Sequence, residues 1–230
     1  MKHTAAISSL AHHDDFLYSG SLDKTVKVWR ISNVKCIEII YAHDDAVNAI
    51  IVGPDGLLFT GSDDCTVKIW RKNIRSSPHM LLTTLRGESG PGRDNGMGPV
   101  KSLALNANGS ALYAGTSNGQ IVCWEKERYS SSQILGGPQH AILSLATGGN
   151  NLLFSGSADA TIRTWIRSDS GPHTCISTMM RAHGGPVKCI VSTLDDENDV
   201  MLFTGGLDGA VKLWRISVKQ RRRPLTTVDR

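Results

Sequence analysis

The sequence predicts an all-β protein built from repeated antiparallel strands, and three observations lead to this prediction. All five tryptophans occupy the same place in one recurring pattern, which consists of an apolar strand, a turn with Asp or Asn, and a second strand that ends in Trp. A further segment of alternating polarity precedes each copy of the pattern. No stretch of useful length has the 3.6-residue periodicity of an amphipathic helix.

The pattern is clearest at residues 57–70. It returns without gaps at residues 16–29, 111–124, 152–165 and 201–214. Successive tryptophans are 41, 54, 41 and 49 residues apart, so the basic period is about 41 with extra residues in two places. A fixed period in this range indicates a chain of equivalent supersecondary units.

Each unit supplies four short strands. Turn residues such as those at 53–56 and 106–109 separate the alternating segment from the core pattern, as a hairpin requires. A β-rich run follows the tryptophan in the first four units. Those runs are residues 36–40, 80–85, 133–135 and 174–179. A lone four-stranded unit cannot bury two apolar faces, so we expect the units to stack face to face.

Composition narrows the classes of function. There is no apolar run of 18 residues, so we expect no membrane span, and the N-terminus lacks the apolar block of a secretion signal. The five cysteines, at positions 36, 65, 123, 175 and 189, are scattered and form no CxxC pair. They favour reduced thiols and a cytoplasmic location, with the nucleus as the alternative. We expect no metal site and no cofactor.

Charge is concentrated at the C-terminus. The net charge of +4 comes entirely from residues 219–230, and the rest of the chain has equal numbers of basic and acidic residues. We therefore expect no direct binding of nucleic acid. The basic tail at 217–230 has three interpretations: a solvated tail, a nuclear-import signal, or a last outer strand at 223–228, in which residues 224–228 resemble residues 81–85.

Four repeats contain a histidine, a hydroxyl residue, an aspartate and a tryptophan in the same order. These sets are His3, Ser19, Asp23 and Trp29; His43, Thr60, Asp64 and Trp70; His140, Ser155, Asp159 and Trp165; and His183, Thr204, Asp208 and Trp214. The third repeat departs from the pattern, with Gly96 or a neighbour, Ala114 and Asn118 in place of the polar residues.

Serine, histidine and aspartate together also form the triad of hydrolases. An active site needs one copy, however, and this set recurs four times without a Gly-x-Ser-x-Gly elbow. We therefore predict buried hydrogen-bond networks and no catalytic residues. Each bond in such a network contributes about 1 kcal/mol, and an orphaned member costs about 1–3 kcal/mol.

The period and the recurring polar set resemble the WD40 repeat over about residues 3–216. Residues 17–30 and 42–50 look more narrowly like the plant JINGUBANG-type WD40 proteins. The resemblance implies a β-propeller in residues 1–216, with five four-stranded blades. The repeats are expected at about 3–30, 42–71, 97–125, 139–166 and 182–215. Because WD40 rings usually have seven blades, a partial or open ring is expected, either a truncated seven-blade protein or a complete five-blade one.

The resemblance also implies a function. WD40 proteins act as scaffolds, so we expect a non-catalytic adaptor that binds other proteins or peptides, in a plant signalling or developmental pathway. Two alternatives are a nuclear cofactor that binds transcription factors and an enzyme with an active site on the propeller axis. We expect no small-molecule substrate.

One end of the propeller is the candidate partner-binding face. It comprises Leu22, Asp44, Asp45, Asp63, Ser117, Ala158, Gly184, Gly185 and Leu207. The leucines beside the acidic group would suit a peptide with apolar and basic residues. The alternative is that all of these are ordinary turn residues.

Overall fold

The computed structural model describes residues 2–72, 78–87, 96–126, 129, 132–137, 140–149, 151–168, 173–195 and 199–217. Within these residues the chain forms nineteen strands and no α-helix. None of the described segments is a helix long and apolar enough to cross a membrane. The predicted all-β class is therefore confirmed.

The strands form consecutive antiparallel meanders, which we call blades 1 to 5. Blade 1 contains β1 (Ile7–His13), β2 (Phe16–Ser21), β3 (Thr25–Arg30) and β4 (Lys35–Tyr41). Blade 2 contains β5 (Val47–Val52), β6 (Leu58–Ser62), β7 (Val67–Lys72) and β8 (His79–Leu85). Blade 3 contains β9 (Val100–Leu105), β10 (Ala111–Thr116), β11 (Ile121–Glu125) and β12 (Ser132–Leu135).

The last two blades continue the same order. Blade 4 contains β13 (Ile142–Gly148), β14 (Leu152–Ser157), β15 (Ile162–Ile166) and β16 (Thr174–Met179). Blade 5 contains β17 (Val187–Leu194), β18 (Val200–Gly206) and β19 (Val211–Ile216), which makes three strands in the described part of the chain. The predicted outer strand at 223–228 lies outside the described residues.

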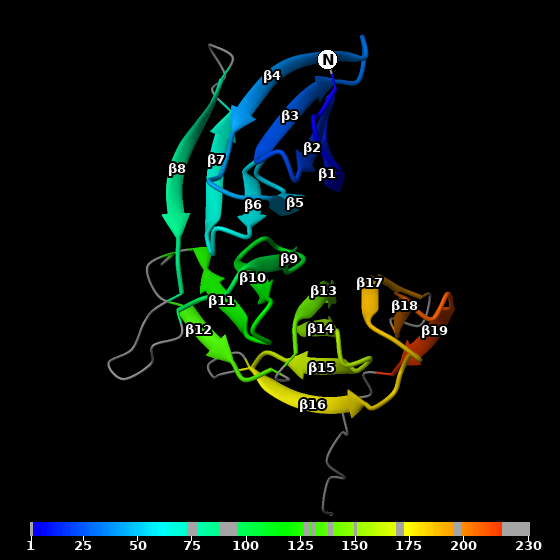
Figure 1. Ribbon diagram of the computed structural model, residues 1–230. Helices are drawn as coiled ribbons and strands as arrows, with labels where there is room; N and C mark the ends of the chain where they lie inside the picture. Colours follow the sequence, from blue (N-terminus) through cyan, green and yellow to red (C-terminus); the bar gives the residue numbers. More distant parts are fainter. Residues whose placement is uncertain are drawn as a thin grey trace, which may run out of the picture.

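The blades stand side by side around a common centre and form an open arc (Figure 1). The first strand of each blade lies innermost, and these strands pack in succession, β1 on β5, β5 on β9, β9 on β13 and β13 on β17. The arc is open between blade 1 and blade 5 (Figure 1). This arrangement agrees with the predicted open propeller.

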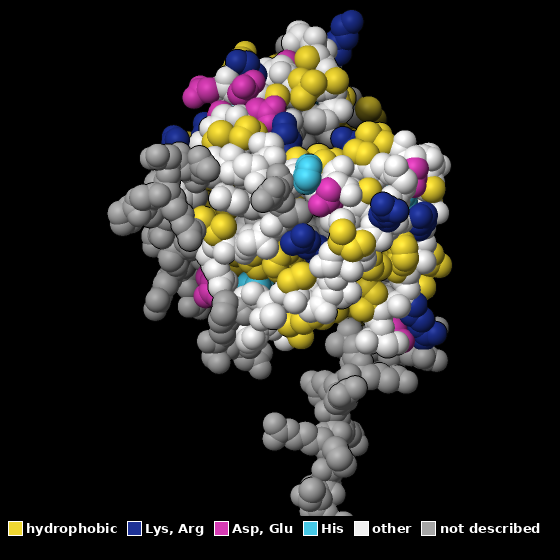
Figure 2. All heavy atoms as spheres, turned by 60° about the horizontal axis from the view of Figure 1, so that its bottom comes forward, with side chains coloured by type: hydrophobic (Ala, Val, Ile, Leu, Met, Phe, Trp, Pro, Cys, Tyr) yellow, Lys and Arg dark blue, Asp and Glu magenta, His cyan; other side chains and the backbone are white. Residues whose placement is uncertain are grey.

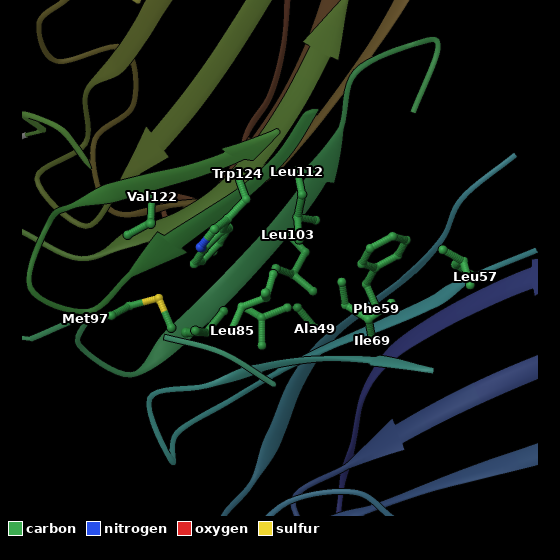
Figure 3. Packing of buried hydrophobic residues seen from close by; sticks show 13 residues of the cluster. Ala49, Leu57, Phe59, Ile69, Leu85, Met97, Leu103, Leu112, Val122 and Trp124 are labelled. Atoms are coloured by element: carbon green, nitrogen blue, oxygen red, sulfur yellow. The ribbon is translucent and has the colours of Figure 1, made fainter. Parts of the chain in front are cut away.

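The hydrophobic core consists of layers between adjacent blades. One cluster joins Phe59 and Ile69 of blade 2 to Leu103, Leu112 and Trp124 of blade 3 (Figure 3). Equivalent clusters lie between blades 1 and 2, blades 3 and 4, and blades 4 and 5. Each blade alternates apolar residues between its two faces, so it contributes to the layer on each side.

A glycine on the second strand of each of the first four blades lets the next blade approach closely. A Cβ atom on Gly61 would lie 2.5 Å from Val100 Cγ1, and one on Gly115 would lie 2.5 Å from Ile142 Cγ2. In the same way Gly20 faces Ile50 of blade 2, and Gly156 faces Val187 of blade 5. The glycine at this position of the repeated pattern is therefore a packing requirement between blades.

Candidate functional site

The second repeat closes the predicted hydrogen-bond network completely. His43 Nδ1 lies 2.8 Å from Asp64 Oδ2, and His43 Nε2 lies 2.7 Å from Thr60 Oγ1. Trp70 Nε1 donates to the same Thr60 oxygen at 3.0 Å. His43 and Thr60 are buried. The network ties the loop that enters blade 2 to β6, to the turn after it and to β7.

The bond directions fix one tautomer of the histidine. Because Thr60 Oγ1 accepts from Trp70, its own hydrogen is free to reach His43 Nε2, and Nδ1–H then donates to the Asp64 carboxylate. Burial lowers the pKa of His43, and the Asp64 carboxylate offsets this only partly. A neutral ring in this tautomer satisfies every group in the chain of hydrogen bonds.

The aspartate is held in its charged form. Burial alone would raise the pKa of Asp64, but hydrogen bonds from Thr66 and His43 and the backbone N–H of Asp44 bring it below its ordinary value. Thr66 donates to Asp64 Oδ1 at 2.6 Å. The carboxylate therefore accepts hydrogen bonds from both the turn and the entering loop.

The first and fifth repeats assemble the same set. His3 lies 2.9 Å from Asp23 and 2.8 Å from Ser19, and Trp29 donates to Ser19 at 2.9 Å. In the fifth repeat the corresponding contacts measure 3.0 Å for His183 with Asp208, 2.8 Å for His183 with Thr204 and 2.9 Å for Trp214 with Thr204.

The prediction for the fourth repeat is wrong at the histidine. His140 Nδ1 is 4.0 Å from Asp159, its side chain is 64% exposed, and no hydrogen bond joins it to Ser155 in the described structure. The bond from Trp165 to Ser155, at 3.0 Å, is made. The fourth repeat therefore has the hydrogen bond from the tryptophan to the serine but lacks the hydrogen bonds of the histidine.

The cause is the spacing between the histidine and the first strand. In the complete repeats the histidine stands four residues before the first residue of the inner strand, as with His43 and Val47. His140 stands only two residues before Ile142, and both Val47 and Ile142 pair with the Ser that ends the second strand. His140 is therefore too close to the strand to enter the network.

The third repeat has an apolar substitute for the network. Met97 is buried in the cluster that contains Trp124, beside Val122 and Leu85 (Figure 3). Ala114 offers no hydroxyl group, and the Asn118 side chain accepts from Thr116 in its own turn. Blade 3 thus packs without the histidine link.

A lysine that sequence reasoning did not predict accompanies each complete network. Lys68 Nζ donates to the carbonyl of Ala42 at 2.7 Å, and Lys212 Nζ donates to that of Ala182 at 2.6 Å, in each case the residue before the histidine. Lys27 donates to the carbonyl of Lys2 in the same way. The signal was present, because lysine stands two residues before Trp29, Trp70 and Trp214 but not before Trp124 or Trp165.

The candidate partner-binding face lies at the end of the arc that carries the turns between the second and third strands. Five of its residues occupy one equivalent position, and each donates its backbone N–H to the loop before the inner strand. These bonds are Leu22 to Ala6, Asp63 to Ala46, Ser117 to Pro99, Ala158 to Ala141 and Leu207 to Pro186, at 2.8–3.0 Å. These five equivalent positions form a row of turn residues whose backbone is held by hydrogen bonds, while their side chains differ.

The remaining residues of this face lie in the entering loops. Asp44, Asp45 and Gly184 are exposed, and Gly185 is partly buried. Leu22 and Leu207 expose 45% and 68% of their surface, so each offers apolar area to a partner.

Charge on this face is smaller than the sequence suggested. Asp63 forms an ion pair with Lys101 and accepts a hydrogen bond from Asn48 at 2.7 Å, so it is already neutralised. Lys24 donates to the Asp44 carbonyl at 2.7 Å and adds a positive charge beside the acidic loop. Figure 2 shows the molecule turned by 60° from the view of Figure 1. On the side that faces the reader there, charged side chains of both signs and hydrophobic side chains are interspersed. The leucines, rather than a strong acidic field, therefore distinguish the candidate face.

Comparison with known proteins identifies the family of three of the five repeats. The WD40 family profile, described as WD domain, G-beta repeat, matches residues 1–30, 34–71 and 173–215. These three segments are WD40 repeats, and they contain residues of the three networks that close completely. The blades between them have the same antiparallel order.

Individual relatives are proteins of several kinds. The putative E3 ubiquitin-protein ligase LIN-1 of Lotus japonicus is 27% identical over 263 residues, covering 94% of this chain and 16% of that protein. The kinesin-like protein KIF21A of Homo sapiens is 26% identical over 237 residues, covering 94% and 14%. The guanine nucleotide-binding protein subunit beta of Oryza sativa subsp. japonica is 32% identical over 178 residues, covering 72% and 45%. The chain thus spans less than half the length of each of these relatives.

Proposed function

We propose that this chain is a non-catalytic scaffold that binds a protein or peptide partner on the face containing Leu22 and Leu207. WD40 domains generally act as protein-interaction scaffolds, and this chain contains WD40 repeats. The observation that carries the proposal is the row of five equivalent turn positions, which combines a fixed backbone with unlike side chains. A rigid framework that presents variable groups is what selective recognition requires.

The buried networks support a structural role rather than hydrolysis. The hydroxyl groups of Ser19, Thr60 and Thr204 are buried, and each accepts a hydrogen bond from a tryptophan. A serine or threonine nucleophile must reach its substrate, whereas these oxygens are enclosed between strands. The proposal therefore assigns them to the stability of the blades.

The pathway and the location of this protein stay predictions. Several of the relatives are plant proteins, and a role in plant signalling or development, including membership of the JINGUBANG-like group, stays a prediction. A cytoplasmic location, with import into the nucleus through residues 219–224 as the alternative, also stays a prediction, because the tail lies outside the described residues.

The test compares partner recovery with the face intact and with it altered. Tagged wild-type protein and the double variant Leu22→Glu with Leu207→Glu are used for affinity capture from plant extract, with quantitative mass spectrometry. Val34→Glu is the matched control, because Val34 is 84% exposed in the turn between β3 and β4 of blade 1. We expect specific partners to disappear from the double variant and to persist with the control. Equal recovery by all three proteins, with equal melting temperatures, would rule out this face.

A further inference from the structure

A polar cluster crosses the boundary between blades 1 and 2. His79, at the start of β8 in blade 2, is buried, and its Nδ1 atom lies 2.8 Å from Glu38 Oε2 in β4 of blade 1. The Nε2 atom of the same ring lies 3.3 Å from the Tyr18 hydroxyl oxygen in β2. The two rings meet edge to face, with 87° between their planes. We call these three residues the blade 1–2 clasp.

The boundary between blades 3 and 4 has a matching cluster. His173 stands directly before β16 of blade 4, and its Nε2 atom lies 2.9 Å from the Tyr113 hydroxyl oxygen in β10 of blade 3. Its Nδ1 atom lies 3.2 Å from Gln133 Oε1 in β12, and the angle between the two rings is again 87°. We call these residues the blade 3–4 clasp. Each clasp thus joins the outer strand of one blade to the second and outer strands of the blade before it.

The two clasps occupy the same positions of the repeat. Each tyrosine pairs across the sheet with the residue that precedes the tryptophan of its blade, and Glu38 or Gln133 pairs with that same residue from the other side. The chain therefore contains an internal substitution. The acceptor for the histidine is a carboxylate in the blade 1–2 clasp and a neutral amide in the blade 3–4 clasp.

The carboxylate of the blade 1–2 clasp is held in its charged form. Glu38 accepts the side-chain N–H of His79 at 2.8 Å and its backbone N–H at 2.7 Å. Burial alone would raise the pKa of Glu38, but these hydrogen bonds bring it below its ordinary value. An anionic acceptor at Nδ1 can hold the imidazole ring in its neutral form and in its protonated form.

A protonated His173 has no such anionic acceptor among the residues that the structure describes. The charged or titratable groups around its clasp are Tyr113, Cys123, Glu125 and Arg167, and Glu125 is already paired with Arg167 at 2.7 Å. Burial and then Arg167 lower the pKa of His173, and Glu125 opposes this only in part. Protonation also makes Nε2 a donor, so the Tyr113 hydroxyl can no longer donate to it.

A buried cysteine lies in the same boundary. Cys123 is 4% exposed and belongs to the hydrophobic cluster in which Tyr113 of blade 3 meets Leu153 and Trp165 of blade 4. Burial raises the pKa of the Cys123 thiol to about 12, so the thiol is unreactive while the two blades are packed together. Any separation of blades 3 and 4 exposes it.

We propose that the boundary between blades 3 and 4 is an acid-sensitive hinge, at which protonation of His173 breaks the blade 3–4 clasp and exposes Cys123 while the blade 1–2 clasp stays closed. The open form binds a proton at the ordinary histidine pKa of about 6.5, whereas the closed form binds it only at lower pH. The open population therefore grows as the pH falls. A single proton limits this growth to about tenfold between about pH 7.5 and about pH 5.5.

The reactivity of Cys123 tests the proposal on the full chain. A dipyridyl disulfide, which also reacts with thiols in mild acid, is added, and modification is followed by mass spectrometry. Exposed Cys189 in blade 5 is the internal reference, because the ratio of the two rates removes the common effect of pH on thiolate formation. We expect the ratio of Cys123 to Cys189 to rise about five- to tenfold from about pH 7.5 to about pH 5.5.

Three variants separate the clasp from other causes. Gln133→Glu gives the blade 3–4 clasp the carboxylate of the other clasp, so the rise should fall below about twofold. His173→Gln removes the titrating group and should abolish the rise. Ser177→Glu is the matched control, because it adds a carboxylate at an exposed position of β16 away from the clasp, and it should behave as the wild type. Circular dichroism at about pH 7.5 establishes that each variant is folded.

Hydrogen exchange distinguishes a hinge from unfolding of the whole chain. After correction for intrinsic rates, we expect β10, β12 and β16 to lose protection at about pH 5.5, whereas β2, β4 and β8 keep it. Glu38→Gln gives the blade 1–2 clasp a neutral amide, so in this variant β2, β4 and β8 should lose protection as well.

Four results would overturn the proposal. The first is a ratio of Cys123 to Cys189 that is the same at both pH values. The second is an undiminished rise in folded His173→Gln, which would assign the response to another group. The third is an equal rise in Gln133→Glu and Ser177→Glu. The fourth is a simultaneous loss of protection in all blades of the wild type, which would show global unfolding in place of a hinge.

Discussion

Blades 2 and 4 share three of the four network residues in equivalent places, yet only blade 2 closes its network. Both contain the tryptophan, the hydroxyl residue and the aspartate, and Trp70 and Trp165 donate to their partners at the same distance of 3.0 Å. His43 is buried in its network, whereas the side chain of His140 is 64% exposed. The distance along the chain from histidine to inner strand, rather than the presence of the residues, therefore decides whether the link forms.

The largest expected effect is the same in both blades. Trp70→Ala and Trp165→Ala each remove a buried indole ring, so each should lower the free energy of unfolding by about 3–5 kcal/mol. Urea unfolding monitored by circular dichroism measures both losses. Similar values would locate the difference between the blades at the histidine, whereas a much smaller loss for Trp165→Ala would show that the whole fourth network is weak.

Removing the aspartate should lower the free energy of unfolding more in blade 2 than in blade 4. Asp64→Ala removes the acceptor of His43, Thr66 and the Asp44 N–H, so we expect a loss of about 1–3 kcal/mol. Asp159→Ala removes an acceptor used by Thr161 but by no buried histidine, so its loss should be smaller. Urea unfolding measures both losses, because a shift of the midpoint at an unchanged slope reports a change in the free energy of unfolding. Equal losses would contradict the assigned role of the histidine.

Moving the histidine should repair the fourth repeat. Pro138 stands four residues before Ile142 in the sequence, so Pro138→His combined with His140→Ala restores the spacing of the complete repeats. One additional network hydrogen bond should raise the free energy of unfolding by about 1 kcal/mol. The control is His140→Ala alone. A double variant no more stable than this control would show that spacing is not sufficient.

The smallest expected effect is a dependence on pH. The pKa of His43 is lowered in the folded state, mainly by burial. The unfolded chain therefore takes up a proton first as the pH falls below about 6.5, and stability is lost between that pH and the folded-state pKa. Melting temperatures of wild type and His43→Ala between about pH 7.5 and about pH 5.5 test this. The wild type should lose more than the variant, and parallel curves would contradict the neutral buried ring.

Much of the fold could be predicted from the sequence because it depends on local patterns. Alternating strands, turn residues and the fixed place of tryptophan determined five repeats, and the structure confirms their antiparallel order. The networks of the first, second and fifth repeats also assemble as the residue pattern indicated.

The errors have physical causes that can be named. Aligning the repeats on tryptophan hid the shorter segment between His140 and Ile142, because the register of the inner strand was not compared. The lysines at 27, 68 and 212 were not assigned a role from the sequence, although each donates a hydrogen bond to a backbone carbonyl before the inner strand. Neither error requires information that the sequence lacks.

Other contacts could not be predicted because they join distant residues of adjacent blades. His79 Nδ1 lies 2.8 Å from Glu38 of blade 1, and its Nε2 lies 3.3 Å from the Tyr18 hydroxyl. His173 lies 2.9 Å from Tyr113 between blades 3 and 4. No local periodicity relates residues about forty to sixty positions apart, so only the packed sheets reveal these links.

The most direct test of the structural role of the networks compares His43→Ala with His140→Ala in equilibrium unfolding. Removing His43 takes a hydrogen-bond partner from both Asp64 and Thr60 in the interior, so we predict a loss of about 1–3 kcal/mol. Removing the exposed His140 should change the free energy of unfolding by less than about 0.5 kcal/mol. Equal effects of the two substitutions, or no effect of His43→Ala, would contradict this role.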